Sequence, residues 1–501
     1  MTEPATPAIT GSMLHDLVKC ERKVHHDLHS DPSRRDGVGE FVEMLWRGGR
    51  EHEEAVLARM PGTVVDLRQV PKPERMAATM AALRSGAETI LGGRLEHGDM
   101  LGEPDVLRRA GDDWIAGDVK TGGAFEQDGE TPRREYAAQV AHYAIMLEGL
   151  NAGRGDTALV IGRDGDDTLY DLRMRRGRAG TSIADAAAAL AAKARAIRDG
   201  RHEALGAMSA TCKMCCWHTV CGRELEDADD LTLLAGIGRS VRDVLAPHAP
   251  TVAALATLDP RPLVRPRGRT SVPGLGAERL ARFQARARLV VEGGAAYARE
   301  PLGLARAPRE LHFDIEADPS RDGLVYLHGV LDVRRRDGVQ TSEYVRFFAE
   351  TEDDERHAFA QALEFLSADP SAMIYYYSKY ERSSYRALQR RHPDVCSPEE
   401  IETLFDPARA VDLLFDVIMP KTEWPLRNLS IKTIARHLGF DWRDEHASGA
   451  ASIAWYDDYR RSGDPAIRGR IERYNEDDVL ASLAVLDGLI ALPVRLEDEN
   501  A

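Results

Sequence analysis

The sequence predicts a multidomain α/β protein in which two α/β units flank a short helical segment. The chain has 501 residues, more than one hydrophobic core normally organises, so several domains are expected. Short apolar strands alternate with amphipathic helices over residues 1–225 and again over 308–501. Between them, residues 226–300 contain short helical patterns separated by Gly-hydrophobic-Gly turns. We therefore expect three domains with these boundaries.

The composition is globular, and the charge balance is acidic. A formal net charge of −16 argues against a surface that binds nucleic acid over its whole extent, although one basic sector can still do so. The first ten residues, MTEPATPAIT, lack the basic region and apolar core of a signal sequence, and no apolar run reaches the roughly 18 residues of a membrane span. We therefore expect a cytoplasmic protein without a membrane partner.

In the first domain the hydrophobic pattern predicts a sheet flanked by helices. Residues 1–60 have a helical pattern, and a short strand at GTVVDL precedes a helix at VPKPERMAATMAAL. The helix REYAAQVAHYAIMLEGL separates a first group of strands from the strands DTALVIG and DTLYDLRM. An Ala-rich helix at about 181–199 then leads to a cluster of cysteines. The first group of strands is expected near 93–102, 104–109 and 113–119.

Two of these extended segments carry acids that a hairpin would bring together. Asp105 ends the sequence GEPD, and Asp118 precedes Lys120 in DVK. In a hairpin the two aspartates can reach one divalent cation, which prefers carboxylate oxygens. Asp118 and Lys120 share a strand face, so the lysine can orient a water or neutralise developing phosphate charge. The alternative is a salt-bridged hairpin without a metal.

Further polar residues lie in helices on either side of this hairpin. Gly49-x-x-His52 is upstream, and Gln139-x-x-x-Tyr143 places two polar side chains one helical turn apart downstream. Together these features resemble the RecB-like branch of the PD-(D/E)XK nuclease superfamily over about residues 10–225. The resemblance implies that Gln139 and Tyr143 support the site or contact DNA.

The same resemblance implies roles for the remaining polar residues. Asp105 and Asp118 would bind Mg²⁺ or Mn²⁺, and His52 would be an additional ligand. Lys120 would assist the attacking water. A satisfied helix histidine is the alternative for His52.

Four of the six cysteines lie within residues 212–221. In a long intracellular chain this crowding indicates a metal site rather than a disulfide framework. Cys212, Cys215 and Cys221 need a fourth ligand for a closed tetrahedral or cubane site, and Cys20 is the candidate. Such a site would join the N-terminal helix to the end of the domain.

This cysteine pattern resembles the iron–sulfur clasp of RecB-like nucleases in some bacterial recombination enzymes and CRISPR-associated accessory nucleases. The resemblance implies a structural [4Fe–4S] cluster. Zinc is the alternative, because thiolate spacing alone does not select iron over zinc. Cys216 is an adjacent extra thiol, and we expect Cys396 to be a buried small hydrophobe.

The middle segment contains two similar turns, Gly236-Ile237-Gly238 and Gly274-Leu275-Gly276, each followed by a helical pattern. Glycines can present backbone N–H groups to a phosphate at a helix N-terminus. The pair resembles a small all-α tandem helix-hairpin-helix module, which implies DNA-backbone binding through Gly236, Gly238, Gly274 and Gly276. Residues 261–310 hold eleven arginines against four glutamates, which predicts a basic stripe. Tight helix connections and solvated arginines are the alternative.

The third domain is predicted to begin with the strands LHFDIEAD, GLVYLHGVLDV and SEYVRFFAE, followed by a helix, the strand AMIYYY and further helices. Asp314 and Glu316 share one face of the first strand. Far downstream, Tyr474 and Asp478 lie one turn apart on a helix. Acids from a strand and a later helix can converge on two magnesium ions, and a tyrosine beside them can orient the attacking water.

This domain resembles the DEDD-type exonucleases of the ribonuclease H-like superfamily over about residues 308–490. The resemblance implies metal binding by Asp314, Glu316 and Asp478. Glu381, in YYYSKYERSSYRAL, matches the second motif, where many relatives have aspartate, so its longer arm places the metal geometry in question. Asp412 matches a further acidic position with an expected structural role. Acids that line an exposed sheet edge, and a catalytically silent fold, are the alternatives.

Together these features predict a PD-(D/E)XK nuclease fold, a helix-hairpin-helix module and a ribonuclease H-like domain in series. We expect a metal-dependent nuclease that hydrolyses DNA, as single strands or from duplex ends, in repair, recombination or defence. The sequence has no Gly-x-x-x-x-Gly-Lys-Ser/Thr phosphate loop, so any duplex opening requires a separate helicase partner. The alternative is a nucleic-acid-binding scaffold with inactive nuclease sites and a structural zinc.

Overall fold

The chain forms two compact units, Met1–Glu224 and Leu225–Ala501. Each unit has its own sheets and its own hydrophobic core, and the mixed α/β architecture confirms the predicted fold class at this level. Residues 226–300, the expected helical module, are part of the second unit. The computed structural model describes residues 6–126, 128–177, 180–445 and 448–495.

A six-stranded mixed sheet forms the centre of the first unit, with the strand order β2-β3-β6-β7-β8-β9. Strands β6 and β7 form an antiparallel hairpin, whereas β8 runs parallel to β7. A parallel neighbour requires a crossover, which helix α5 (Arg134–Gly149) provides. The other strands of this sheet are β2 (Val64–Asp66), β3 (Thr89–Leu91), β6 (Val106–Ala110), β7 (Asp113–Val119), β8 (Thr157–Ile161) and β9 (Asp167–Asp171).

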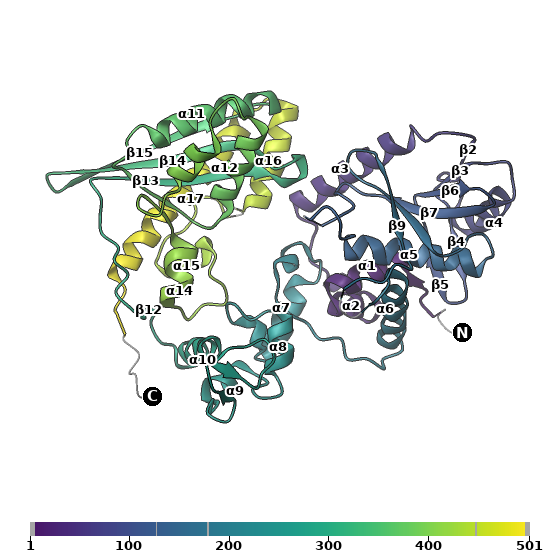
Figure 1. Cartoon of the computed structure of the whole chain (residues 1–501), viewed down its shortest axis with the longest axis horizontal. Coiled ribbons are helices and arrows are strands. Elements are labelled where there is room, and N and C mark those ends of the chain that lie inside the picture. The colour runs from purple at the N-terminus through teal and green to yellow at the C-terminus, as the bar shows by residue number, and fades with distance from the viewer. Residues whose placement is uncertain (1–5, 127, 178–179, 446–447, 496–501) are drawn as a thin grey trace. The chain divides into compact units, whose positions relative to one another are not determined.

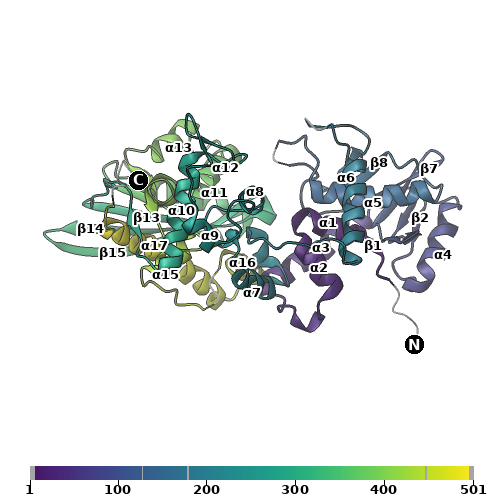
Figure 2. The ribbon, with the colours of Figure 1, turned by 90° about the horizontal axis from the view of Figure 1, so that it is seen from below.

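Helices cover this sheet, and α5 lies between it and helices α1 and α6, so most of the surface of α5 is buried (Figures 1 and 2). The side chain of Thr10 caps α1, and Ser182 with Asp185 forms a capping box at the start of α6. The helices are α1 (Gly11–Lys19), α2 (Glu21–His29), α3 (Glu40–Leu57), α4 (Lys72–Leu83), α6 (Ile183–Arg198) and α7 (His218–Asp227).

Two local predictions in this unit were wrong. Residues 9–10, expected to be helical, form strand β1 (Ile9–Thr10), which pairs with β5 (Met100–Gly102). The single extended segment expected near 93–102 is a hairpin of β4 (Leu95–His97) and β5, because Gly98 turns the chain in the left-handed region with φ of 60°. Together these strands make a separate sheet of order β1-β5-β4.

The second unit contains a five-stranded sheet of order β15-β14-β13-β16-β17. Its first three strands are antiparallel, and β16 and β17 then extend β13 in parallel. Helix α11 covers one face and the long helix α17 covers the other (Figure 1). The strands are β13 (Arg309–Asp318), β14 (Leu324–Arg336), β15 (Val339–Phe348), β16 (Met373–Tyr376) and β17 (Ala410–Asp412).

The remaining helices of this part surround the sheet. Asp464 caps α17 and Pro465 occupies its first position, where a missing N–H is tolerated. A π-helical segment, Leu413–Ile418, follows β17. The helices are α11 (Glu355–Ser367), α12 (Tyr380–Arg391), α13 (Pro398–Leu404), α14 (Met419–Lys421), α15 (Ile431–His437), α16 (Gly449–Ser462) and α17 (Pro465–Ala491).

The module that precedes this sheet has a small core of its own, in which α9 and α10 pack together (Figure 2). Its helices are α8 (Arg239–Leu245), α9 (Val252–Thr257) and α10 (Ala277–Glu292). The expectation of an all-α module was wrong, because β10 (Val264–Arg265) and β11 (Arg269–Thr270) form a hairpin within it.

Helix α10 is joined to the rest of the unit through β12 (Tyr297–Ala298), which pairs with β18 (Thr422–Glu423). Within the described residues, no helix has the length and apolar character required to cross a membrane.

Candidate metal and catalytic sites

Three acids meet beneath helix α17 in the second unit. Asp314 and Glu316 extend from the same face of β13, and Asp478 extends from α17 toward them. One ligand oxygen from each of the three carboxylates lies within 4.8 Å of the others. The sequence predicted all three residues, and the structure brings them together.

Asn475, which the sequence analysis did not identify, fixes the first of these acids. It lies one turn before Asp478 and is fully buried. Its Nδ2 donates to Oδ2 of Asp314 at 2.7 Å, and its Oδ1 accepts from the hydroxyl of Tyr344 at 2.9 Å. Gly329 pairs with Asp314 across the sheet, and a Cβ at this glycine would overlap Asn475 Oδ1. The glycine therefore leaves space for the amide.

Asp478 is held by aromatic residues on the other side of the cluster. Trp442 Nε1 donates to Oδ1 of Asp478 at 2.7 Å, and Tyr474 makes a further hydrogen bond to this carboxylate. Lys432 of α15 places its Nζ 4.6 Å from the ring centre of Tyr474 and 5.4 Å from that of Trp442. The positive charge of Lys432 partly offsets the rise in the pKa of Asp314, Glu316 and Asp478. The predicted Tyr474 therefore lies within the site, and Lys432 is an additional member.

The positive charge of Lys432 does not compensate the negative charges of the three carboxylates in this cluster. Burial and then Asp478 raise the pKa of Glu316 to about 8, and burial raises the pKa of Asp478 to about 6 despite Lys432. Burial and the charges of Asp478, Glu316 and Glu381 raise the pKa of Asp314 well above its usual range. Clustered carboxylates that repel one another in a buried site are the ligand set that a divalent cation stabilises, so these residues fit Mg²⁺ or Mn²⁺.

Glu381 lies at the edge of this cluster, on the first turn of α12. It is buried, and among the described residues its Oε2 has no hydrogen-bond partner. Burial and the nearby charges of Asp412 and Asp478 raise its pKa well above the usual range. It does not belong to the group of acids whose ligand atoms lie within 4.8 Å. Its longer side chain therefore faces the site without joining the close cluster.

Asp412 uses its carboxylate to hold the backbone around Glu381. Its Oδ1 accepts from the backbone N–H groups of Ser378, Leu414 and Phe415 at 2.9–3.1 Å. Ser378 has a φ of 108°, a conformation that is costly for a residue with a side chain. The hydrogen bond from Asp412 thus stabilises the strained entry into α12, the helix that carries Glu381.

In the first unit, the β6–β7 hairpin brings Asp105 and Asp118 together. Asp105 immediately precedes β6, and its Oδ2 accepts from the backbone N–H of Val119 at 2.8 Å. Its own backbone N–H lies 3.4 Å from Oδ1 of Asp118. Asp118 is buried, and Lys120 Nζ donates to its Oδ2 at 2.9 Å.

A chain of hydrogen bonds continues from this lysine into α5. Lys120 Nζ donates to Oε1 of Gln139 at 3.0 Å, and Gln139 Nε2 donates to the hydroxyl of Tyr143 at 3.0 Å. Tyr143 is only 3% exposed. Its position supports Gln139 from the interior, so the expectation that Tyr143 contacts DNA does not fit the structure.

Helix α3 adds Glu53, a third acid at this site, which the sequence analysis missed. Burial and the charge of Asp118 raise the pKa of Glu53. Burial and the charges of Asp118 and Glu53 raise the pKa of Asp105 well above its usual range. A glutamate directly after His52 was visible in the sequence, but only the path of α3 shows that it faces the aspartates. Among the described residues, Glu53, Asp105 and Asp118 do not form a group of three whose ligand atoms lie within 4.8 Å of one another. Their carboxylates, with Lys120 beside them, are the type of ligand that a divalent cation prefers.

His52, the predicted additional ligand, lies beside Glu53 on α3. Among the described residues its Nε2 is buried and has no hydrogen-bond partner. No group of three His, Cys, Asp or Glu ligand atoms within 4.8 Å forms around it in the described part of the chain. Nε2 of His52 is therefore available to a ligand, but His52 is not part of a close group of metal-ligand atoms.

The predicted cysteine ligands come partly together at the junction of α1, α2 and α7. Burial, then Glu224, Cys20 and Cys215, raises the pKa of Cys221 to about 12, so these thiols act on one another. Burial raises the pKa of Cys215 to about 11, with Cys20 contributing. Cys212 lies in a 3-10 helical segment, with its Sγ 3.7 Å from the carbonyl oxygen of Ala207.

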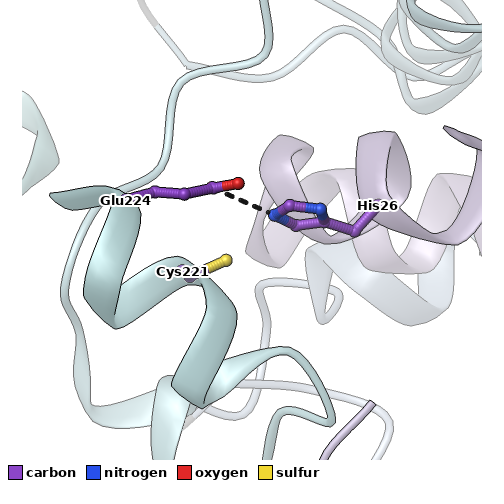
Figure 3. Close-up of side chains that lie close together, drawn as sticks. All are labelled: His26, Cys221 and Glu224. Carbon is purple, nitrogen blue, oxygen red and sulfur yellow. Dashed lines mark hydrogen bonds and ion pairs between the residues drawn. The ribbon is translucent and has the colours of Figure 1, made fainter. Parts of the chain in front are cut away.

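The close ligand group at this junction is not the one predicted. His26, Cys221 and Glu224 present ligand atoms within 4.8 Å of one another, and Figure 3 shows them pointing toward a common centre. His26 Nε2 lies 3.2 Å from Oε2 of Glu224, and Arg22 forms an ion pair with the same carboxylate at 2.8 Å. The arginine already neutralises Glu224, which opposes a cation at this position.

The two glycine turns of the module have the same local conformation. Gly236 and Gly274 adopt positive φ angles of 89° and 71°, and the hydrophobic residue after each is buried. Gly238 and Gly276 then serve as the N-caps of α8 and α10. A substituted residue is strained at positive φ, so the first glycine of each turn is required by the backbone.

Most of the predicted basic stripe is used within the protein. Buried Glu423 forms ion pairs with Arg286 at 2.8 Å, Arg282 at 3.2 Å and Arg299 at 4.0 Å. Arg306 and Arg309 also have acidic partners. Exposed arginines without an ion pair among the described residues are Arg265, Arg267 and Arg269 on the β10–β11 hairpin. Arg279 and Arg288 of α10 are also exposed and donate only to the backbone carbonyl oxygens of Gly236 and Ala256. The continuous stripe expected over 261–310 is thus reduced to this hairpin and two positions on α10.

Comparison with known families identifies both α/β parts. Residues 1–222 match the family model of the PD-(D/E)XK nuclease superfamily, and residues 311–490 match that of the RNase_H superfamily. A search of curated proteins found no match. The two predicted superfamilies are confirmed, whereas the RecB-like and DEDD-type assignments, the helix-hairpin-helix module and the iron–sulfur site stay predictions.

Proposed function

We propose that this protein, whose chain carries one domain of the PD-(D/E)XK nuclease superfamily and one of the RNase_H superfamily, is a metal-dependent nuclease that hydrolyses DNA. The observation that carries the proposal is the cluster of Asp314, Glu316 and Asp478, whose ligand atoms lie within 4.8 Å of one another. The raised pKa values of these buried acids are the electrostatic cost that bound Mg²⁺ or Mn²⁺ would offset. Support from the first unit comes from the paired Asp105 and Asp118.

In the RNase H-like part, the chain's own residues prepare a site for phosphodiester hydrolysis. Divalent ions held by the three acids would activate a water and stabilise the leaving oxygen. Asn475 keeps Asp314 in one orientation, and Trp442 does the same for Asp478. The hydroxyl of Tyr474, which hydrogen-bonds Asp478, is placed to orient the attacking water.

In the PD-(D/E)XK part, Asp105 and Asp118 would hold the ion, with Glu53 as a third carboxylate. Lys120 is fixed between Asp118 and Gln139, so its ammonium group is pre-organised. A fixed cation at this point stabilises the negative charge that develops on the phosphate. The neighbouring charges of Asp118 and Asp105 raise its pKa despite burial, which keeps the side chain protonated.

We propose that the module of residues 226–300 contacts the DNA backbone. Its two matching glycine turns are typical of contacts with a nucleic-acid backbone, and exposed Arg265, Arg267 and Arg269 add positive charge. The substrate would be single-stranded DNA or a duplex end, in repair, recombination or defence. Duplex opening would come from a separate helicase partner.

For the cysteines we propose a structural [4Fe–4S] cluster held by Cys20, Cys212, Cys215 and Cys221. Tetrahedral zinc with Zn–S bonds of about 2.3 Å would require sulfur atoms about 3.8 Å apart. Among the described residues, no three thiols lie within 4.8 Å of one another. Thiolate spacing alone does not select iron over zinc. Iron and sulfide analysis with the visible absorption spectrum of the purified protein tests the assignment.

The nuclease is tested with end-labelled single- and double-stranded DNA and RNA in the presence of Mg²⁺ or Mn²⁺. We expect Asp118→Ala and Asp314→Ala each to remove a distinct part of the cleavage products. Asp112→Ala, at the turn of the β6–β7 hairpin, and Asp353→Ala, exposed in the segment before α11, are matched controls that leave the products unchanged. Cleavage that persists when both sites are substituted contradicts the proposal.

A second candidate is a nucleic-acid-binding scaffold with one or both nuclease sites inactive and a structural zinc. The position of Glu381, buried and outside the close acidic cluster, favours it for the RNase H-like site. A colourless protein that contains zinc, with residual cleavage that neither substitution changes, would support the scaffold.

A further inference from the structure

Helix α3 has one face that is packed at its C-terminal end and open at its N-terminal end. Val56 and Leu57, in its last turn, belong to the same hydrophobic cluster as Val106 and Val119. These two valines directly follow Asp105 and Asp118 in the chain. The end of α3 is therefore anchored beside the acidic pair.

Glu53 and Trp46 lie on the same side of this helix. They are seven residues apart, which places them within about 20° of each other around the helix and about 10.5 Å apart along it. Glu53 lies three and four residues before Val56 and Leu57, on the same face of α3, and these two residues pack against Val106 and Val119. This side of α3 is therefore turned toward the acids. Trp46 continues the same side two turns farther from the metal site.

Trp46 is unusually exposed for its size. Its exposed fraction is 54%, whereas the other five tryptophans are at most 7% exposed. Neighbouring Leu45 is 36% exposed. Tryptophan side chains are usually mostly buried. A large exposed aromatic side chain next to an exposed leucine, beside an active site, therefore indicates a binding surface.

The surface between Trp46 and Glu53 is open to a ligand. Gly49, three residues after Trp46, lies in this stretch, and a Cβ built on it would meet no atom within 4 Å. Arg50, one turn after Trp46, is exposed on the adjacent flank. The side of α3 that leads to the acids therefore presents the ring of Trp46, the uncovered backbone at Gly49 and the charge of Arg50.

We propose that Trp46 stacks on an unpaired base of a single-stranded nucleic acid whose backbone passes to Asp105 and Asp118. The inference rests on the nuclease function proposed above and assigns a substrate class to the PD-(D/E)XK site. A base in a duplex has both faces covered by its neighbours, so only an unpaired base presents a face to Trp46. Arg50 would contact the adjoining phosphate.

The stacking is tested first by binding, without cleavage. Because Trp46 is the exposed tryptophan, acrylamide quenching of intrinsic fluorescence reports mainly on this residue. We expect oligo(dT), added to the full-length protein in EDTA, to protect this fluorescence from acrylamide. Trp46→Phe should lack the accessible component before oligo(dT) is added. Binding of oligo(dT), seen by anisotropy, that leaves the acrylamide accessibility unchanged would overturn the proposal.

Cleavage gives the second test, in an Asp314→Asn background that leaves only the PD-(D/E)XK site active. We expect Trp46→Ala to raise KM for single-stranded DNA by about fivefold or more, with little change in kcat, and Trp46→Phe to restore most of the loss. Leu169→Ala, which removes another exposed apolar side chain from the same unit, is the control. A Trp46→Ala protein that behaves like this control contradicts the stacking.

The two tests separate this inference from the function on which it rests. If Asp314→Asn protein cleaves no substrate, the nuclease proposal for the first unit fails. The fluorescence result then still decides whether Trp46 contacts a single strand.

Discussion

Asn475 donates a hydrogen bond from Nδ2 to Oδ2 of Asp314 at 2.7 Å, joining helix α17 to the first strand of the RNase H-like sheet. The hydroxyl of Tyr344 fixes the other end of the same amide at 2.9 Å. The acid is therefore oriented by a residue three positions before Asp478, its partner in the cluster. A metal site assembled from two elements needs such a connection, because small changes in ligand direction weaken metal binding.

Replacing Asn475 by alanine should reduce cleavage at the RNase H-like site by about tenfold to a hundredfold, the usual cost of losing a residue that orients a metal ligand. The rate is measured in an Asp118→Ala background, so that only this site contributes. Tyr344→Phe, which removes only the outer hydrogen bond, should have a smaller effect. An Asn475→Ala protein with full activity would show that Asp314 does not depend on the amide.

Gly329→Ala should damage both the stability and the activity of the second unit. The new Cβ would overlap the Oδ1 of Asn475, so either the amide or the strand must move. Overpacking of this kind costs about 1–3 kcal/mol of unfolding free energy, measured by denaturant titration. In the double variant Gly329→Ala, Asn475→Ala the losses should be less than additive, because the residue that clashes is gone. Strict additivity would contradict this packing relationship.

Glu310 makes stability depend on acid pH. Burial opposes its ionisation, but nearby His312, the backbone N–H of Ala307 and the ion pair with Arg335 at 2.6 Å hold its pKa at about 2, below the usual 4.5. Since the folded pKa is the lower one, the stabilisation is complete above pH 4.5 and is lost as the pH falls toward 2. The expected contribution is at most about 3 kcal/mol.

The measurement compares the unfolding free energy of wild type and Glu310→Gln from pH 7 to pH 2. The difference between the two should be largest above pH 4.5 and should shrink toward pH 2. Glu364→Gln, an exposed acid on α11, is the control and should show no such trend. A constant difference across the range would mean that the ionisation of Glu310 does not contribute.

Glu423→Gln should destabilise the contact between α10 and the β18 region. Glu423 is fully buried and faces three arginines, so its removal leaves uncompensated positive charge inside the protein. Losing one partner of a buried ion pair costs about 3–5 kcal/mol. Thermal unfolding of Glu423→Gln is compared with that of Glu300→Gln, whose side chain is exposed and 3.6 Å from Lys421. Equal melting temperatures would contradict the role of Glu423.

The sequence alone was sufficient for relationships that depend on local periodicity. Asp314 with Glu316, and Asp118 with Lys120, share strand faces because side chains alternate. Asn475 lay within the recognised helix but could not be assigned, because its role depends on α17 crossing β14 at Gly329. Glu53 was missed for the same reason, since only the path of α3 turns it toward the aspartates.

The basic stripe shows where sequence reasoning fails most clearly. A run of arginines suggests an exposed cationic surface only if no acid elsewhere in the chain neutralises it. Arg286 instead pairs with Glu423, which lies 137 residues away in the sequence. Such a partner is invisible to any local pattern, and only part of the run, including Arg265, Arg267 and Arg269, stays exposed.

The central claim is that two separate groups of acids each bind divalent metal for hydrolysis. Titration of the full-length protein with Mn²⁺, followed by electron paramagnetic resonance, tests it most directly because free and bound Mn²⁺ give different signals. We predict that Asp118→Ala and Asp314→Ala each remove a different part of the bound Mn²⁺, and that the double variant retains neither. Unchanged Mn²⁺ binding in the double variant, with the fold intact, would contradict the account.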